Sequence, residues 1–150
     1  MSDDVESAVD LGVLGSFAGY HLRRAAVVFA ANFANAMQTT RIRQVQFGIM
    51  SVLAANPGMN QGTVGRALGI QRANMVTLIN ELVDRDLVAR NASPGDRRVV
   101  SLSLTAAGEA ALADCLALIT VHEEVMLANL DGHEREQLIV LLGRITAVGG

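Results

Sequence analysis

The stretch "QGTVGRALGIQRANMVTLINELVDRDLVARNASPGDRRVVSLSLTAAG", residues 61–108, decides the fold of this chain. It opens with two short amphipathic segments, expected as helices over 61–68 and 72–85, which a turn containing Gly69 separates. Asn60 can cap the first helix by accepting from a free backbone amide, and Gly69 suits the position that follows a helix. Two short helices joined by a tight glycine turn are typical of a helix-turn-helix.

A predicted β-hairpin follows the second helix directly. Leu87–Asn91 is expected to form one strand, 92–98 the turn, and Val99–Leu104 the other strand, in which apolar and polar side chains alternate. Thr105 can then cap a long helix over about 106–128. A helix-turn-helix followed at once by a hairpin is a winged helix.

Working outward, the pattern predicts further helices over 11–37, 45–55 and 131–148. The 11–37 helix is apolar around nearly its whole circumference, so it is expected to be covered by a partner subunit. The predicted fold class is therefore mainly α with a small β-hairpin. A disordered acidic tail at 1–10 precedes a single domain at 11–150, with dimerisation helices at 11–38 and 106–148 and a winged-helix DNA-binding lobe at 44–105.

Cationic residues concentrate in the centre of the chain. The formal net charge is −3, and all 12 basic residues are Arg. Residues 41–98 hold eight Arg and four acidic residues, whereas 1–40 hold two Arg and four acids, and 99–150 hold two Arg and seven acids. A polyanion responds to the local field, and guanidinium groups suit phosphate. This distribution indicates a nucleic-acid partner.

The 72–85 helix carries the candidate base-reading residues. Its apolar stripe, expected to face inward, consists of Met75, Val76, Ile79, Leu82 and Val83. Arg72, Ala73, Asn74 and Thr77 lie on the other side, near the end that enters a major groove in such folds. Arg72 can pair with guanine, Asn74 with adenine, and Thr77 can offer its methyl group to thymine. The alternative is that these are ordinary solvated helix residues.

The hairpin and the helix surfaces supply further cationic candidates. Arg97 and Arg98 at the hairpin tip could reach a minor groove, whose negative potential attracts Arg, with Asp96 orienting one guanidinium through a fork-type pair. The alternative is a solvated turn with a local ion pair that adds little stability. Additional phosphate contacts are expected from Arg41, Arg43 and Arg66.

Other classes of protein find little support in the sequence. The single Cys115 excludes an intramolecular disulfide, and its apolar neighbours favour a buried structural thiol over a redox sensor. The apolar run around 25–36 is too short to cross a bilayer, and the acidic residues 1–10 do not read as a signal peptide. We therefore expect a cytoplasmic protein with no membrane partner.

Catalytic and metal-binding motifs are also absent from the sequence. The histidines at 21, 122 and 133 lack metal-ligand spacing, and no Gly-x-Ser-x-Gly nucleophile motif occurs. The glycines at 62, 65 and 69 do not match a dinucleotide-binding loop, which requires a preceding strand. No enzyme activity, catalytic residue, metal or cofactor is expected.

Two stretches resemble the MarR family of bacterial transcriptional regulators. They are "QVQFGIMSVLAANPGMNQGTVGRALGIQRANMVTLINELVDRDLVAR" at 44–90 and "SPGDRRVVSLSLTAAGEAAL" at 93–112. The second carries the family's wing pattern: Asp-x-Arg at 96–98, Leu-Thr at 104–105, and Gly108. The resemblance spans 11–147 and departs from the family at Gln71, where a better N-cap is common. It implies a homodimer, an operator with two-fold symmetry and, often, a small aromatic or phenolic effector that releases DNA.

The resemblance also implies an effector site between the dimerisation helices and the DNA-reading lobe. The candidate residues are Tyr20, His21, Arg24, Phe47 and Met50. Arg24 could hold a carboxylate, and Tyr20 or His21 could hydrogen-bond an oxygen, while Phe47 and Met50 supply an apolar wall. Such a site would accept a small aromatic acid or its thioester. The alternative pairs Arg24 with an acid across the dimerisation module, such as Glu123 or Glu124.

The sequence therefore predicts a homodimeric, sequence-specific DNA-binding transcriptional regulator. Two recognition helices about 34 Å apart would meet a pseudo-palindromic operator in double-stranded DNA, and covering a promoter would repress transcription until the effector binds. The alternative is a helical dimerisation or protein-interaction module of winged-helix shape that does not bind DNA. Salt separates the two, because DNA affinity falls steeply with ionic strength.

Overall fold

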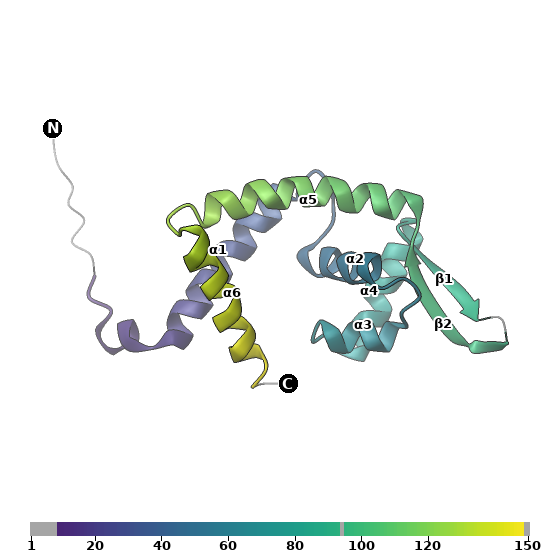
Figure 1. The fold of residues 1–150 in the computed structure, drawn as a ribbon, viewed down its shortest axis with the longest axis horizontal. Coiled ribbons are helices and arrows are strands. Elements are labelled where there is room, and N and C mark those ends of the chain that lie inside the picture. The colour runs from purple at the N-terminus through teal and green to yellow at the C-terminus, as the bar shows by residue number, and fades with distance from the viewer. Residues whose placement is uncertain (1–8, 94, 149–150) are drawn as a thin grey trace.

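The computed structural model describes residues 9–93 and 95–148, with the backbone alone for Ser93 and Arg97. Figure 1 shows α5 bridging the two ends of the molecule, with α1 and α6 gathered at one end and α2–α4 and the hairpin at the other. In chain order the elements are η1 (Gly12–Ser16, a 3-10 turn), α1 (Ala18–Ala36), α2 (Gln44–Ala55), α3 (Gln61–Ala67), α4 (Arg72–Asp84), β1 (Val88–Ser93), β2 (Asp96–Leu104), α5 (Ala106–Met126) and α6 (Gly132–Thr146).

The elements from α2 to β2, residues 44–104, form a lobe with its own core. We call it the central lobe because it comes from the middle of the chain, although it lies at one end of the molecule. The two strands pair antiparallel, from Val88 opposite Leu104 to Ala92 opposite Val100. Leu102 also forms a hydrogen bond outside the hairpin: its amide donates to the carbonyl of Met59 at 2.9 Å. This bond ties the hairpin to the loop before α3. The side chains most deeply buried in this core are Ile49, Met50, Leu53, Val64, Met75, Ile79, Leu82, Val88 and Leu102.

Local capping in the lobe follows the sequence prediction. The Asn60 side chain accepts a hydrogen bond from the amide of Thr63 at 2.9 Å, at the start of α3. Gly69 adopts a φ of 65° between α3 and α4, a conformation that favours glycine. Thr105 accepts from the amide of Gly108 at 2.9 Å and so caps α5. These contacts confirm the predicted turn and helix starts.

Gly108 marks the seam where α5 meets the central lobe. The amide of Thr105 donates to the carbonyl of Leu87 at 3.1 Å, which brings the first turn of α5 onto the chain just before β1. A Cβ atom placed on Gly108 would overlap that same carbonyl oxygen. Close approach of two backbones therefore explains why glycine stands at this position.

The start of the helix predicted over 11–37 is wrong, because α1 begins only at Ala18. The chain forms η1, becomes extended at Phe17 with φ −100° and ψ 117°, and only then enters α1. Gly15 and Ser16 are weak helix formers, and no polar side chain caps α1, so nothing compensates for an interruption there.

The hairpin turn is shorter than the predicted 92–98. β1 continues to Ser93, and β2 already begins at Asp96, so Arg98 lies within a strand rather than in the turn. The longer strands follow from pairing of Ala92 with Val100, after which the register shifts.

Val76 is a third correction, because it was expected on the inward face of the 72–85 helix. It is 44% exposed, because the buried face of α4 centres on Met75, Ile79 and Leu82. One residue further along a helix turns about 100° away from that face.

The remaining elements, η1, α1, the C-terminal half of α5 and α6, form a helical module with little core of its own. Phe33 is the residue that α1 buries, and α6 buries none. Large apolar side chains stay open to solvent, including Val125 at 69% and Ile139 at 71%. Among the described residues, no helix has both the length and the hydrophobicity that a membrane crossing requires.

Candidate nucleic-acid interface

The exposed side of α4 carries the predicted base-reading residues. Arg72, Ala73, Asn74 and Thr77 are all exposed. Met75, which lies between Asn74 and Thr77 in the sequence, is buried in the core. The helix begins at Arg72, and Gln71 at its N-cap makes no side-chain capping bond. The N-terminal half of α4 therefore presents polar side chains outward from a rigid base.

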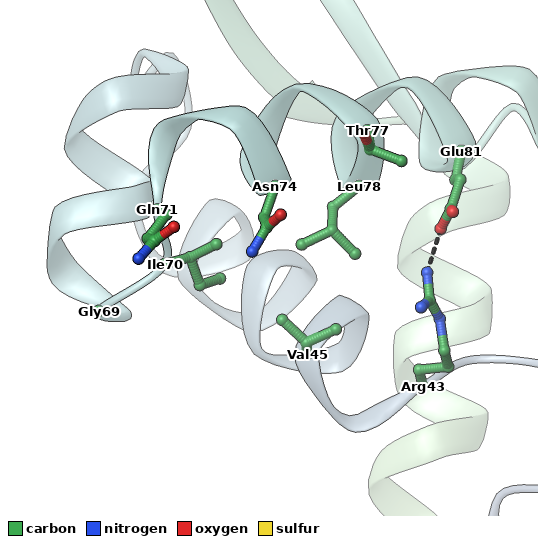
Figure 2. Close-up of a pocket in the computed structure, with 9 residues that line it drawn as sticks. All are labelled: Arg43, Val45, Gly69, Ile70, Gln71, Asn74, Thr77, Leu78 and Glu81. Atoms are coloured by element: carbon green, nitrogen blue, oxygen red, sulfur yellow. Dashed lines mark hydrogen bonds and ion pairs between the residues drawn. The ribbon is translucent and has the colours of Figure 1, made fainter.

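A hollow of about 610 Å³ runs along α4 where α2 begins. Figure 2 shows Gln71 just before α4 and then Asn74, Leu78 and Glu81 along the helix. Val45 from the start of α2 faces them. Asn74 and Thr77 thus line a concave surface that also contains apolar side chains, among them Val45, Ile70 and Leu78. Its two charged members are Arg43 and Glu81.

Arg43 lies against Glu81, with which it forms an ion pair. The same carboxylate accepts a hydrogen bond from the side-chain amide of Gln46 at 2.8 Å, and Gln46 is almost fully buried. The side-chain oxygen of Gln46 in turn accepts from the amide of Arg43 at 3.0 Å. Arg43 is therefore fixed at the start of α2, with an internal partner for its charge.

Arg66 and Arg72 come together at a second hollow of about 420 Å³, next to the start of α3. Arg66 donates to the hydroxyl of Thr63 at 3.1 Å, which holds its side chain along α3. Arg41 stands apart from both, exposed in the segment between α1 and α2 with a φ of 55°. Arg66 and Arg72 therefore lie at the N-terminal end of α4, whereas Arg43 and Arg41 lie towards its C-terminal end, at Glu81 and Arg85.

Arg98 projects from the hairpin, with its side chain 94% exposed. Asp96 accepts a hydrogen bond from the backbone amide of Arg98 at 2.9 Å, whereas the nearest guanidinium nitrogen is 3.8 Å away. Between Asp96 and Arg98 there is therefore one long ion-pair contact through Nε and no two-pronged fork, while the carboxylate shapes the backbone. The side chain of Arg97 lies outside the described residues.

Sequence reasoning missed two arginines at the edges of α4. Arg90 on β1 donates to the side-chain oxygen of Asn80 on α4, and Arg85 donates to carbonyls in the segment before α2. Their only signal in the sequence is the excess of Arg over acids in the central segment. Neither partner lies near its arginine on the same helix, so periodicity could not reveal these bonds.

Comparison with known proteins assigns the chain to a family. A model described as the MarR family matches residues 39–99. A Thauera aromatica protein named as a transcriptional regulatory protein for the hcr operon is 33% identical over 135 residues, which are 89% of this chain and 81% of the relative. This chain belongs to the MarR family. It is accordingly a transcriptional regulator of the winged-helix class.

Two solved structures of a MarR-family repressor, CouR, are similar to the chain along most of its length. CouR bound to a 23-mer DNA duplex is 34% identical, with a TM-score of 0.88, and the match covers 93% of this chain and 99% of that one. CouR bound to p-coumaroyl-CoA is 32% identical, with a TM-score of 0.82, covering 92% and 97%. The predicted fold class is confirmed.

The predicted effector residues of this MarR-family chain lie in two separate places. Tyr20, His21 and Arg24 lie near the start of α1, where the His21 ring meets the carbonyl of Gly15 at 3.0 Å. The ion pairs of the described residues leave Arg24 out, and Glu124 pairs with Arg135. Helical rise puts Tyr20 about 20 Å before Phe33, the α1 residue whose ring faces Phe47. One chain therefore does not bring the two sets together.

Met50 does not form the predicted apolar wall. Its side chain is fully buried in the lobe core, whereas Phe47 is half-buried beside Phe33. The ring of His122 on α5 stands edge-on to Phe33 and Phe29, with centroids 5.8 and 5.7 Å apart. Both its ring nitrogens are buried without a hydrogen-bond partner among the described residues. The sequence gives no sign of this setting, because Phe33 and Phe29 lie 89 and 93 residues before His122.

Cys115 lies fully buried in α5. Burial raises the pKa of its thiol, an effect that the Thr40 hydroxyl only partly offsets. A neutral, enclosed thiol agrees with the structural role expected for it. Among the described residues, His, Cys, Asp and Glu side chains form no group of three that could hold a metal ion.

Proposed function

We propose that this MarR-family regulator acts as a homodimeric repressor that covers a pseudo-palindromic site in double-stranded DNA. The winged helix at 44–105 contacts DNA, and the helices at 11–38 and 106–148 pair two chains. The observation that carries the proposal is the exposed row at the N-terminal half of α4, together with the exposed side chain of Arg98 on the hairpin. The likeness to CouR bound to a DNA duplex supports it.

Each DNA contact has a distinct role in this proposal. Arg72, Asn74 and Thr77 read base edges in a major groove, with Ala73 allowing close approach, because they lie at the N-terminal half of α4. Arg98 and Arg97 reach the adjoining minor groove, and Asp96 fixes the strand that carries them. Three further arginines, Arg41, Arg43 and Arg66, contact phosphates.

Dimerisation covers the apolar surface that a single chain leaves open. The exposed side chains of α6 and of the end of α5 include Val121, Val125, Ile139 and Ile145. Exposed apolar area of this extent is unusual on a monomer and typical of a subunit interface. A two-fold pairing of chains would set two copies of α4 on successive major grooves, about 34 Å apart.

An aromatic acid, or its thioester, is the proposed effector. CouR has been solved with p-coumaroyl-CoA, a thioester of this class. Here the half-buried Phe47 would contact the ring of the ligand. Tyr20, His21 and Arg24, about 20 Å before Phe33 along α1, would hold only the far end of an extended thioester. The buried, unpaired nitrogens of His122 offer a hydrogen-bonding site for a phenolic hydroxyl in the aromatic surroundings of Phe29 and Phe33. Ligand binding raises the melting temperature and weakens DNA binding.

We propose that the protein binds its effector without catalysing a reaction on it. The effector is held and released unchanged, with no cofactor, and the regulator works in the cytoplasm, where DNA is accessible and Cys115 stays reduced. The test is a selection of bound sequences from a pool of random duplex DNA at low ionic strength. We expect enrichment of one two-fold symmetric sequence, and an affinity that falls steeply with salt. No preference for any duplex would overturn the proposal and favour a protein-interaction module.

A further inference from the structure

Arg85, at the C-terminal end of α4, ties that helix to the segment that links α1 to α2. Its guanidinium donates from Nη1 to the carbonyl of Arg41 at 2.8 Å and from Nη2 to the carbonyl of Thr40 at 3.2 Å. Two adjacent carbonyls thus receive the two arms of one planar group, the geometry for which a guanidinium is suited. The bond joins the DNA-reading helix directly to the chain arriving from the helical module.

The clamped segment is itself held in an unusual conformation. Arg41 has a φ of 55°, a backbone conformation that residues other than glycine adopt only where their surroundings impose it. The Thr40 hydroxyl donates to the carbonyl of Met37 at 2.7 Å and accepts from the amide of Ile42 at 3.0 Å. Met37 and Ile42 are both buried. The segment is therefore a fixed bracket rather than a loose linker.

Glu81 provides a second attachment, one helical turn before Arg85. Its carboxylate accepts from Arg43 and from the buried Gln46 at the start of α2. Two attachments one turn apart fix the direction of a helix, since pivoting about either one breaks the other. Arg85 is the attachment further from the DNA-reading end, about 20 Å along α4 from Arg72.

We infer that Arg85 is a positioning residue for DNA binding, one that sets the angle of α4 against the helical module by clamping the carbonyls of Thr40 and Arg41. It acts through this bracket and does not contact DNA. In a two-fold dimer a change in that angle moves both copies of α4, so the clamp determines whether they match successive grooves. The inference rests on the proposed DNA-binding function.

The test measures affinity for the selected duplex across a series of salt concentrations. Arg85→Ala is expected to weaken binding by more than tenfold at fixed salt while the slope of log affinity against log salt stays unchanged. Loss of a phosphate contact would instead lower that slope by about one. Arg85→Lys should recover the lost affinity only in part, because a point ammonium does not reproduce the fork. Arg23→Ala, an exposed charge change on α1, is the matched control and should bind as the parent does.

Circular dichroism and light scattering establish that each variant is folded and dimeric. Were Arg85→Ala to unfold, Arg85→Lys would decide, and parent-level affinity for it would overturn the inference. Parent-level affinity for Arg85→Ala, or a slope lowered by about one with full rescue by Lys, would also overturn it. If the parent itself bound no duplex, the proposed function would fail instead, and the two failures are therefore distinguishable.

Discussion

The central lobe and the helical module differ in where they keep their apolar side chains. In the lobe, residues such as Ile49, Ile79 and Leu102 are at most 1% exposed, and the surface above them is polar and rich in Arg. In the module, Ile139 and Val125 are more than two-thirds exposed, and α6 buries no residue. The lobe completes its core within one chain, whereas the module requires a second chain. The two regions therefore offer two surfaces of opposite chemistry, one for a polyanion and one for an apolar partner.

The largest expected effect comes from placing a charge on the apolar surface of the module. Ile139→Asp should convert the dimer to monomers, because an unpaired carboxylate would be buried in the interface. Operator affinity should then fall by about 100-fold or more, since a monomer loses the second half-site. Light scattering and binding to the selected duplex measure the two effects.

Gln137→Asp, an exposed polar position two residues away on α6, serves as the control and should remain dimeric. A dimer that survived Ile139→Asp unchanged would show that the module pairs through some other face.

The seam between the two regions gives the next effect. Gly108→Ala should lower the free energy of unfolding by about 1–3 kcal/mol or more, because its Cβ would overlap the carbonyl oxygen of Leu87. Gly48→Ala on α2 is the matched control: its Cβ would meet only Leu68, at 3.8 Å, an ordinary contact, so a small gain in helix stability is expected. Urea unfolding of both variants tests the contrast. Equal changes in the free energy of unfolding would show that close backbone approach at Gly108 does not contribute to stability.

The surface of the lobe should respond to the loss of single cations. Arg98→Ala should weaken operator binding by more than tenfold, while the dimer and the melting temperature stay unchanged, because the side chain is almost wholly exposed. Titration of the selected duplex at fixed salt measures the loss. Operator affinity equal to that of the parent would exclude the hairpin from DNA contact.

Asn74→Ala should affect sequence preference more than total affinity. Loss of a bidentate contact to adenine costs about 1–3 kcal/mol at one base pair and nothing on duplexes that already lack that pair. Binding to a panel of single-base variants of the selected site measures this. A uniform loss on every duplex would identify Asn74 as a phosphate contact instead.

Helix caps and periodicity made much of the lobe predictable from sequence. Asn60, Gly69 and Thr105 act within a few residues of their partners, so local pattern was sufficient. The pairing of Arg43 with Glu81 and the clamp at Arg85 join residues 38 or more positions apart, and no local pattern encodes them. The same limit applies to the aromatic setting of His122, which α1 supplies from the other end of the chain.

Details of backbone geometry were also beyond the sequence. Alternation located β2, yet its start depended on pairing with β1, which moved Arg98 from the turn into a strand. The hydrogen bond from the backbone amide of Arg98 to the Asp96 carboxylate is a second such detail, because it depends on the local course of the strand.

The smallest expected effect concerns Cys115, which lies beside the junction of the two regions. Burial raises the pKa of its thiol, so the folded state holds the proton more tightly than the unfolded chain does. Its contribution to stability is therefore present below an ordinary cysteine pKa of about 8.5 and is lost as pH rises further. Unfolding free energy should decline less between pH 8 and 10 in Cys115→Ala than in the parent. Identical slopes would show that the thiol does not titrate differently on folding.

The central claim is that the lobe binds DNA while the helical module pairs two chains. It is tested most directly by the mass of the protein–DNA complex on the selected duplex, measured by analytical ultracentrifugation at low salt. Two chains per duplex are predicted for the parent, and two also for Arg98→Ala at concentrations high enough to saturate it, because the hairpin plays no part in pairing the chains. A single chain bound per duplex at full affinity would contradict the account.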